Sequence, residues 1–304
     1  GLDFVLAVGG GSVIDSAKAI AMGAATGRDP WEFASTGTRP DKTLPVATVL
    51  TLAASGSETS NSCVLTNEET KEKRGITSET NRPVISFLNP ENTFTVSKFQ
   101  TGCGIVDIMM HTLERYLTPE GGESDITDRI AEGLLIAVRD AGRRAIANPR
   151  DYEARASLMW AGSVSHNDYT GCGRKRLFPV HKLEHELSAF RDEIAHGAGL
   201  SVLFPAWAEH EMQYDYPRFA QFANRVLGVE MDFEHPERTA REGIRTLRRF
   251  FEEIGMPTHL SQLSIKPENY EKLAANTVRT VNGPVKSYSP LDEKAIIEIY
   301  RLAE

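Results

Sequence analysis

The sequence has few cysteines, no long apolar run and no excess of positive charge, and each shortage excludes a class of protein. Three scattered cysteines (Cys63, Cys103 and Cys172) form no C-x-x-C pair, so a disulfide framework is not indicated and a reduced, cytoplasmic compartment fits. No apolar run approaches the roughly 18 residues of a membrane span, so no membrane partner is expected. The net charge of −8 argues against broad capture of nucleic acid.

The length of 304 residues with 40% hydrophobic content is enough for a large core, most plausibly in two domains. The chain opens on Gly1-Leu2-Asp3 and enters an apolar run over residues 4–8 at once. Because natural chains rarely begin with a core strand, we expect that an N-terminal segment is missing here.

Strand and helix signals alternate in the first third of the chain. Apolar runs at residues 4–8, 44–50 and 84–88 predict strands, and the spacing of apolar residues over 12–25 predicts a helix. Strands separated by helical segments are typical of a parallel α/β layer. We therefore predict that residues 1–95 form the remainder of an α/β domain.

The pattern changes beyond residue 95, where strand signals fade and helical periodicity dominates. It is clearest over five stretches, at residues 105–116, 125–147, 152–164, 238–254 and 292–303. Residues 96–304 are accordingly predicted to form an all-α helical domain.

A glycine run joins the first predicted strand to the first predicted helix. Gly9, Gly10 and Gly11 would let the backbone approach a ligand closely, and the following helix N-terminus favours a phosphate or pyrophosphate. Ser12 is predicted as the N-cap of this helix, with Asp15 as the acid of a capping box. The run fits neither G-x-G-x-x-G nor the P-loop pattern, so a turn without a ligand stays open as an alternative.

Asp107 and His111 stand four residues apart in an apolar helical stretch, so both side chains lie on one helix face. A carboxylate and an imidazole placed in this way can chelate a divalent cation. A surface Asp–His pair is the alternative, but the apolar flanks indicate burial, and a buried acid needs a partner. Cys103 lies one turn earlier, and we interpret it as core packing.

A second histidine pair with the same spacing follows at His181 and His185, and His196 begins another apolar stretch shortly after. One buried histidine is usually an ordinary core residue. Two i, i+4 motifs and a further histidine together favour a divalent metal site. By contrast, His166 is predicted to lie at a helix end, where a cation suits the helix dipole.

These segments together resemble the iron-activated (group III) alcohol dehydrogenase family, and especially its butanol dehydrogenase-like branch. The matching motifs are GGGSVIDSAK at 9–18, ASGSE at 54–58, D-x-x-x-H at 107–111, HKLEHELSA at 181–189 and HGAG at 196–199. They occur in family order and extend over essentially the whole chain. The resemblance implies an N-terminal α/β nucleotide domain, a C-terminal helical domain and an active site in the cleft between them.

The resemblance also implies the roles of individual residues. The implied metal ligands are Asp107, His111, His181 and His196, and His185 matches a histidine near the substrate that is not a ligand. The NAD(P) pyrophosphate is expected on Gly10, Gly11 and Ser12, with Thr51 and Ser55 touching the nicotinamide or adenine side.

The implied reaction is reversible hydride transfer between NAD or NADP and a primary alcohol or aldehyde of the butanol type, with the metal acting as a Lewis acid. Fe(II) is the family expectation and Zn(II) suits the same ligands. A homodimer or larger homo-oligomer is expected. Two alternatives remain, namely a dehydroquinate synthase-like lyase on the same scaffold and an inactive homologue. The lyase would need a basic substrate pocket, and the one tight basic cluster is at 174–176.

Overall fold

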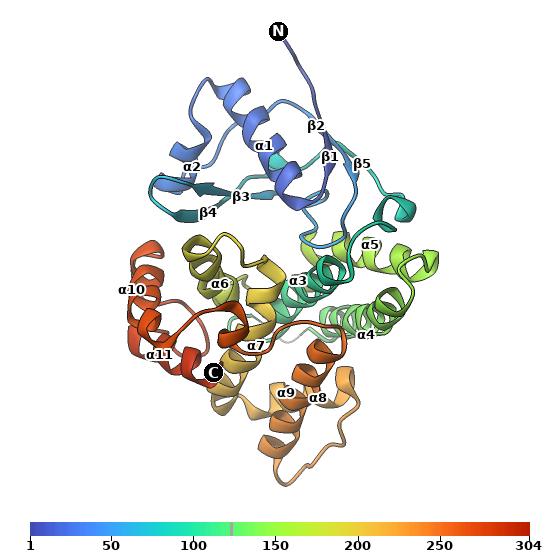
Figure 1. Cartoon of the computed structure of the whole chain (residues 1–304), viewed down its shortest axis with the longest axis vertical. Coiled ribbons are helices and arrows are strands. Elements are labelled where there is room, and N and C mark those ends of the chain that lie inside the picture. Colours follow the sequence, from blue (N-terminus) through green and yellow to red (C-terminus); the bar gives the residue numbers. More distant parts are fainter. Residues whose placement is uncertain (122–123) are drawn as a thin grey trace.

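The computed structural model describes residues 1–121 and 124–304, and these form two lobes (Figure 1). Residues of both lobes line a cleft. The first lobe is α/β. Its elements in chain order are β1 (Val5–Gly9), α1 (Gly11–Thr26), α2 (Pro30–Thr36), β2 (Val46–Leu50), β3 (Ser62–Asn67), β4 (Glu72–Thr77) and β5 (Ile85–Phe87).

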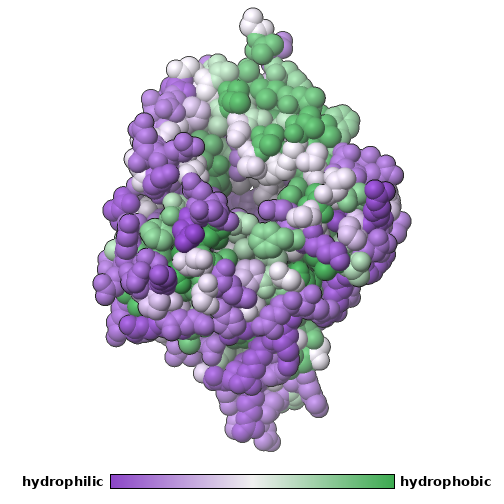
Figure 2. All heavy atoms as spheres, viewed as in Figure 1, coloured by the Kyte–Doolittle hydropathy of each residue, from purple (hydrophilic) through white to green (hydrophobic). Residues whose placement is uncertain are grey.

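Three of these strands form a parallel sheet in the order β1-β2-β5, with Val5 opposite Val46 and Ala47 opposite Ile85. Parallel neighbours need a crossover, and α1 and α2 supply the one between β1 and β2. One sheet face is buried, with Ala7 in a cluster that includes Ile14 of α1. The other face keeps four apolar side chains exposed: Leu6, Val8, Ile85 and Phe87. Figure 2 shows an apolar patch over the α/β lobe.

The strands β3 and β4 form a separate antiparallel hairpin, with Ser62 opposite Thr77. Cys63 and Ile76 of this hairpin pack on Met22 of α1 and Phe33 of α2. The hairpin also contacts α6 of the second lobe. The hairpin therefore forms part of the contact between the two lobes.

The second lobe is helical (Figure 1). Its helices are α3 (Lys98–Tyr116), α4 (Asp125–Ala147), α5 (Tyr152–His166), α6 (Pro179–Phe190), α7 (His196–Glu211), α8 (Tyr216–Leu227), α9 (Pro236–Glu253), α10 (Tyr270–Thr280) and α11 (Glu293–Leu302). The central helix is α3, which is buried continuously from Thr101 to Tyr116 and contacts α4, α5 and α7. Polar groups on α3 consequently face protein or the cleft.

The predicted fold class is confirmed, because a parallel sheet with flanking helices is followed by a mostly helical lobe. The predicted helix at 125–147 coincides with α4. We propose that the domain boundary lies between residues 95 and 96, since β5 ends at Phe87 and α3 begins at Lys98. In the described part of the chain, no helix combines the length and apolar character that crossing a membrane requires.

The predicted capping of α1 is wrong. The N-cap is Gly10 in an extended conformation, no side chain caps the helix, and Ser12 lies within the first turn. Asp15 does not act as a capping acid, because its carboxylate accepts hydrogen bonds from the Ser57 hydroxyl (2.5 Å) and the Val64 N–H (2.9 Å). Tertiary partners thus replace the local bond that the capping pattern predicts.

Candidate active site

A cleft of about 1250 Å³ runs between the lobes and appears as the hollow at the centre of Figure 2. Every site residue that the sequence predicts lines it. The α/β lobe contributes Gly10, Gly11, Ser12, Thr51 and Ser55, and the helical lobe contributes Asp107, His111, His181, His185 and His196.

Three helices bring the predicted metal ligands together. Asp107 and His111 come from α3, His181 from α6 and His196 from the first residue of α7. The Oδ1 atom of Asp107 lies 3.5 Å from His111 Nδ1, 3.7 Å from His181 Nε2 and 3.8 Å from His196 Nε2. The three imidazoles therefore surround one carboxylate oxygen.

This donor set fits a divalent cation. Asp107 Oδ1, His111 Nδ1 and His181 Nε2 are buried and make no hydrogen bond within residues 1–121 and 124–304, an arrangement that costs free energy unless another group satisfies them. Donors about 2.1 Å from a tetrahedral metal lie about 3.4 Å apart. The separations from Asp107 Oδ1 are close to that value, and donor atoms of Asp107, His111 and His181 all lie within 4.8 Å of one another. One cation can therefore contact these three residues, and His196 Nε2 lies 3.8 Å from the same carboxylate oxygen.

The electrostatics of the site favour an ionised Asp107 carboxylate and a neutral His111 imidazole. Burial works to raise the pKa of Asp107, but His111, His181 and His196 outweigh it and lower this pKa below its usual range. Burial, together with the neighbouring His166, holds the pKa of His111 well below the usual value. The carboxylate is therefore ionised and the His111 imidazole neutral, which are the protonation states that bind metal.

His185 lies one turn after His181 on α6, lines the cleft and is half-buried. Its ring centroid is 5.5 Å from that of His196. Glu184, His185 and His196 also have donor atoms close together, but Glu184 contacts His196 through Nδ1, whereas Nε2 of His196 faces Asp107. The geometry therefore favours one metal centre at Asp107, with His185 beside it.

Glycines on α3 and α7 allow the segments that carry the site residues to approach one another closely. A Cβ atom on Gly197 would lie 2.6 Å from the Cα atom of Cys103, so α7 can bring His196 to α3 only with glycine there. A Cβ atom on Gly104 would clash with the carbonyl oxygen of Ala53. Gly104 thus lets α3 contact the turn that carries Thr51 and Ser55.

The N-terminus of α1 forms the opposite side of the cleft. Gly10, Gly11 and Ser12 lie at the beginning of this helix, whose free N–H groups favour an anion. A Cβ atom on Gly11 would clash with Ser55 Oγ, so the turn containing Ser55 packs directly against the glycine run. This arrangement is suited to a pyrophosphate group.

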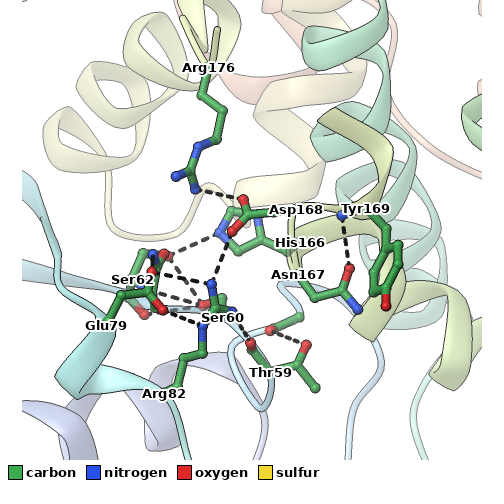
Figure 3. A network of polar contacts seen from close by, with 12 residues as sticks. Thr59, Ser60, Ser62, Glu79, Arg82, His166, Asn167, Asp168, Tyr169 and Arg176 are labelled. Atoms are coloured by element: carbon green, nitrogen blue, oxygen red, sulfur yellow. Dashed lines mark hydrogen bonds and ion pairs between the residues drawn. The ribbon is translucent and has the colours of Figure 1, made fainter. Parts of the chain in front are cut away.

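The prediction for His166 is only half right. It lies at the end of α5, but burial and the adjacent Arg115 lower its pKa well below the usual value, so it is not a cation. Its ring is 4.1 Å from that of His111, and Nε2 is 3.0 Å from Ser62 Oγ (Figure 3). Sequence reasoning missed this cleft residue because its neighbours are distant in sequence.

A polar network beside His166 joins the two lobes (Figure 3). Arg82 contacts Asp168 at 3.0 Å and donates to the carbonyl oxygen of Thr59 at 2.6 Å, and the Thr59 hydroxyl donates to the carbonyl oxygen of Ser163. The basic cluster at 174–176 is also partnered, since Arg174 pairs with Asp128 and Arg176 with Asp168. Its arginines are already engaged within the protein.

Cys103 is buried on α3 and lines the cleft. Burial, with a contribution from Asp107, raises the pKa of its thiol to about 12. Cys103 belongs to the hydrophobic core of the helical lobe, which agrees with the interpretation as core packing.

Family models match both lobes. The description "Iron-containing alcohol dehydrogenase" fits residues 1–90, and "Fe-containing alcohol dehydrogenase family, C-terminal" fits residues 101–303. NADH-dependent butanol dehydrogenase A of Clostridium acetobutylicum is 39% identical over 99% of this chain and 77% of its own length. NADPH-dependent aldehyde reductase YqhD of Escherichia coli is 35% identical over 86% of this chain and 67% of its own length.

The fold has solved counterparts. The crystal structure of NADH-dependent butanol dehydrogenase A from Thermotoga maritima matches with a TM-score of 0.93 and 36% identity, over 99% of this chain and 76% of the other. An α/β lobe and a helical lobe that meet at an Asp–His cluster therefore define a two-lobe oxidoreductase. The chain belongs to the iron-containing alcohol dehydrogenase family, among the NAD(P)-linked alcohol dehydrogenases and aldehyde reductases.

Proposed function

We propose that this chain catalyses metal-dependent, reversible hydride transfer between NAD(P)H and a short aldehyde or primary alcohol. The observation that carries the proposal is the set of three unpartnered buried donor atoms on Asp107, His111 and His181. They face the same cleft as the N-terminus of α1. A cation and a dinucleotide can therefore meet there.

The proposed metal ligands are Asp107, His111, His181 and His196. When bound, the cation supplies Lewis acidity that polarises a carbonyl group. We assign Fe(II), in line with the family description, with Zn(II) as the alternative because imidazole and carboxylate suit both metals. One carboxylate and three imidazoles would fill four positions, so the substrate oxygen would enter as a fifth ligand.

The proposed cofactor residues are Gly10, Gly11 and Ser12 at the pyrophosphate, with Thr51 and Ser55 on the adjacent turn. The N–H groups at the beginning of α1 would hold the phosphate oxygens. The names of the relatives include both NADH and NADPH, so the proposal covers NAD and NADP.

His185 is proposed as the group that moves the proton at the substrate oxygen. Burial and then Lys73 keep its pKa well below the usual value, so its neutral ring can accept a proton and return it, directly or through water. Among the described residues, none forms a hydrogen bond with the ring nitrogens of His185.

The proposed substrates are four-carbon and similar aldehydes and primary alcohols, because butanol dehydrogenases and an aldehyde reductase are among the relatives. We further propose a cytoplasmic homo-oligomer, at least a dimer, with no nucleic-acid or membrane partner. Three free cysteines in the described ranges fit a reducing compartment. Light scattering of the purified protein would test the oligomeric state.

The test is oxidation of NADH and NADPH with butanal by metal-stripped protein, supplied anaerobically with Fe(II), Zn(II) or no metal. We expect oxidation only with metal, and the preferred metal and cofactor follow from the rates. Bound metal without oxidation under any condition would favour the lyase-like or inactive alternative.

A further inference from the structure

Two buried carboxylates stand directly behind two of the cleft histidines. Glu114 of α3 contacts His181 Nδ1, and Glu184 of α6 contacts His196 Nδ1. Both glutamates are fully buried, with 1% and 0% of their surface exposed respectively. Neither contact is part of the predicted ligand set.

The two histidines are oriented in the same way. Each directs Nδ1 at a glutamate and Nε2 at Asp107 Oδ1. A neutral imidazole carries one N–H and one lone pair. A carboxylate at Nδ1 therefore keeps the proton on Nδ1 and leaves the lone pair on Nε2, where a cation would bind.

We propose that Glu114 and Glu184 are positioning residues of the metal centre, which fix the tautomer and ring orientation of His181 and His196. This inference rests on the proposed metal site. It adds that the affinity of the site depends on two acids that do not touch the cation.

The surroundings hold Glu114 against its histidine. Glu114 Oε1 accepts a hydrogen bond of 2.6 Å from the N–H of Val180, the residue before His181. One carboxylate thus binds both the backbone beside His181 and the His181 ring. The beginning of α6 is thereby tied to α3, the helix that carries Asp107.

Glu184 is confined by packing. A Cβ atom on Gly199 would lie 2.6 Å from Glu184 Cγ and 2.9 Å from Oε1, so glycine at this position leaves the space that the carboxylate occupies. Lys73 of the β3–β4 hairpin approaches Glu184 Oε2 at 4.0 Å and donates to Ser188 Oγ at 3.1 Å. Glu184 therefore also lies near a cation, Lys73, which belongs to the α/β lobe.

The rival explanation is that these acids only hold the helices together. The two explanations differ in the metal affinity of the folded protein. A positioning role predicts that removal of the carboxylate weakens metal binding 10-fold to 100-fold. A purely structural role predicts lower stability with unchanged affinity.

The experiment is a Co(II) titration of the metal-free full chain, followed by visible absorption and equilibrium dialysis. The variants are Glu114→Gln and Glu184→Gln, which keep the side-chain size but place a neutral amide at Nδ1. We expect each to bind Co(II) at least 10-fold more weakly than wild type, with a changed visible spectrum.

Glu211→Gln is the matched control. Glu211 is a fully buried acid that contacts His210 Nδ1 at 2.9 Å, but His210 Nε2 faces Glu298 and not the cleft. The Glu211 carboxylate also accepts hydrogen bonds from the hydroxyls of Ser287 and Ser289. We expect this variant to lose stability and keep wild-type affinity for Co(II).

Gly199→Ala keeps the test decisive if a Gln variant fails to fold. It displaces Glu184 without changing any polar group, and we expect Co(II) affinity to fall about 10-fold. Wild-type affinity in the folded Gln variants, or in Gly199→Ala if they do not fold, would overturn the inference. If wild type itself binds no Co(II), the proposed metal site fails instead.

Discussion

The buried ammonium group of Lys18 fixes one wall of the cofactor cleft, and its removal gives a quantitative prediction. Lys18 on α1 is 1% exposed and donates to the carbonyl oxygens of Ser57 (2.7 Å), Ser60 (3.0 Å) and Ser62 (2.7 Å). These serines line the cleft. We predict that Lys18→Met destabilises the protein and loosens this segment.

The expected size follows from two opposing effects. Each hydrogen bond from a charged donor contributes about 1.5–3 kcal/mol, so the three bonds to carbonyl oxygens contribute about 4.5–9 kcal/mol. Burial lowers the pKa of Lys18 from 10.5 to about 8, which corresponds to a cost of about 3 kcal/mol for the buried charge. Methionine removes both effects, so the net loss of stability is about 1–6 kcal/mol.

The assay is urea unfolding of both proteins at pH 7 and pH 10, with the exposed Lys294→Met as control. Between about pH 8 and 10.5 the unfolded chain holds a proton that the native Lys18 has released, so wild type gains stability relative to the variant as pH rises. We expect that gain to be about 2–3 kcal/mol. A loss below about 0.5 kcal/mol at pH 7, or a difference that shrinks with pH, would refute the reasoning.

Three further substitutions test the close approaches and the contact between the lobes. Gly197→Ala places a Cβ atom against Cys103, so calorimetry should show a loss of about 1–3 kcal/mol, and an unchanged Tm would count against the helix contact. Gly11→Ala meets Ser55 Oγ and should raise the KM for cofactor with little change in stability, whereas an unchanged KM would place the cofactor elsewhere. Arg82→Met breaks the bond to Asp168 and should cost about 1–2 kcal/mol in urea unfolding, and no loss would mean that this contact does not hold the lobes.

The parts of the fold that the sequence predicts well depend on local patterns of residues. The helix over 125–147 follows from an amphipathic repeat, and its observed ends coincide with those expected. Asp107 and His111 could be paired because their spacing alone puts them on one helix face. The two histidine motifs together favoured a metal site, but the choice of His181 and not His185 as a ligand depended on the family resemblance.

Features that depend on tertiary contacts were not predicted. Asp15 fits a capping box by spacing, yet its carboxylate binds Ser57 and Val64, which are distant in sequence. The position of His166 beside His111 requires α5 to pack on α3. Glu114 carries one readable signal, because it lies three residues after His111 on a helix too apolar to leave an acid without a partner.

The most direct test of the metal centre is the Fe(II) content of anaerobically reconstituted wild type, His196→Ala and His185→Ala, measured with NAD(P)H-dependent butanal reduction on the same samples. We predict one Fe(II) per chain in wild type and in His185→Ala, with slowed turnover in the latter. His196→Ala should lose both metal and activity. An empty site in His185→Ala would contradict the account, because it would show that a ligand and the proton-transfer group have been interchanged.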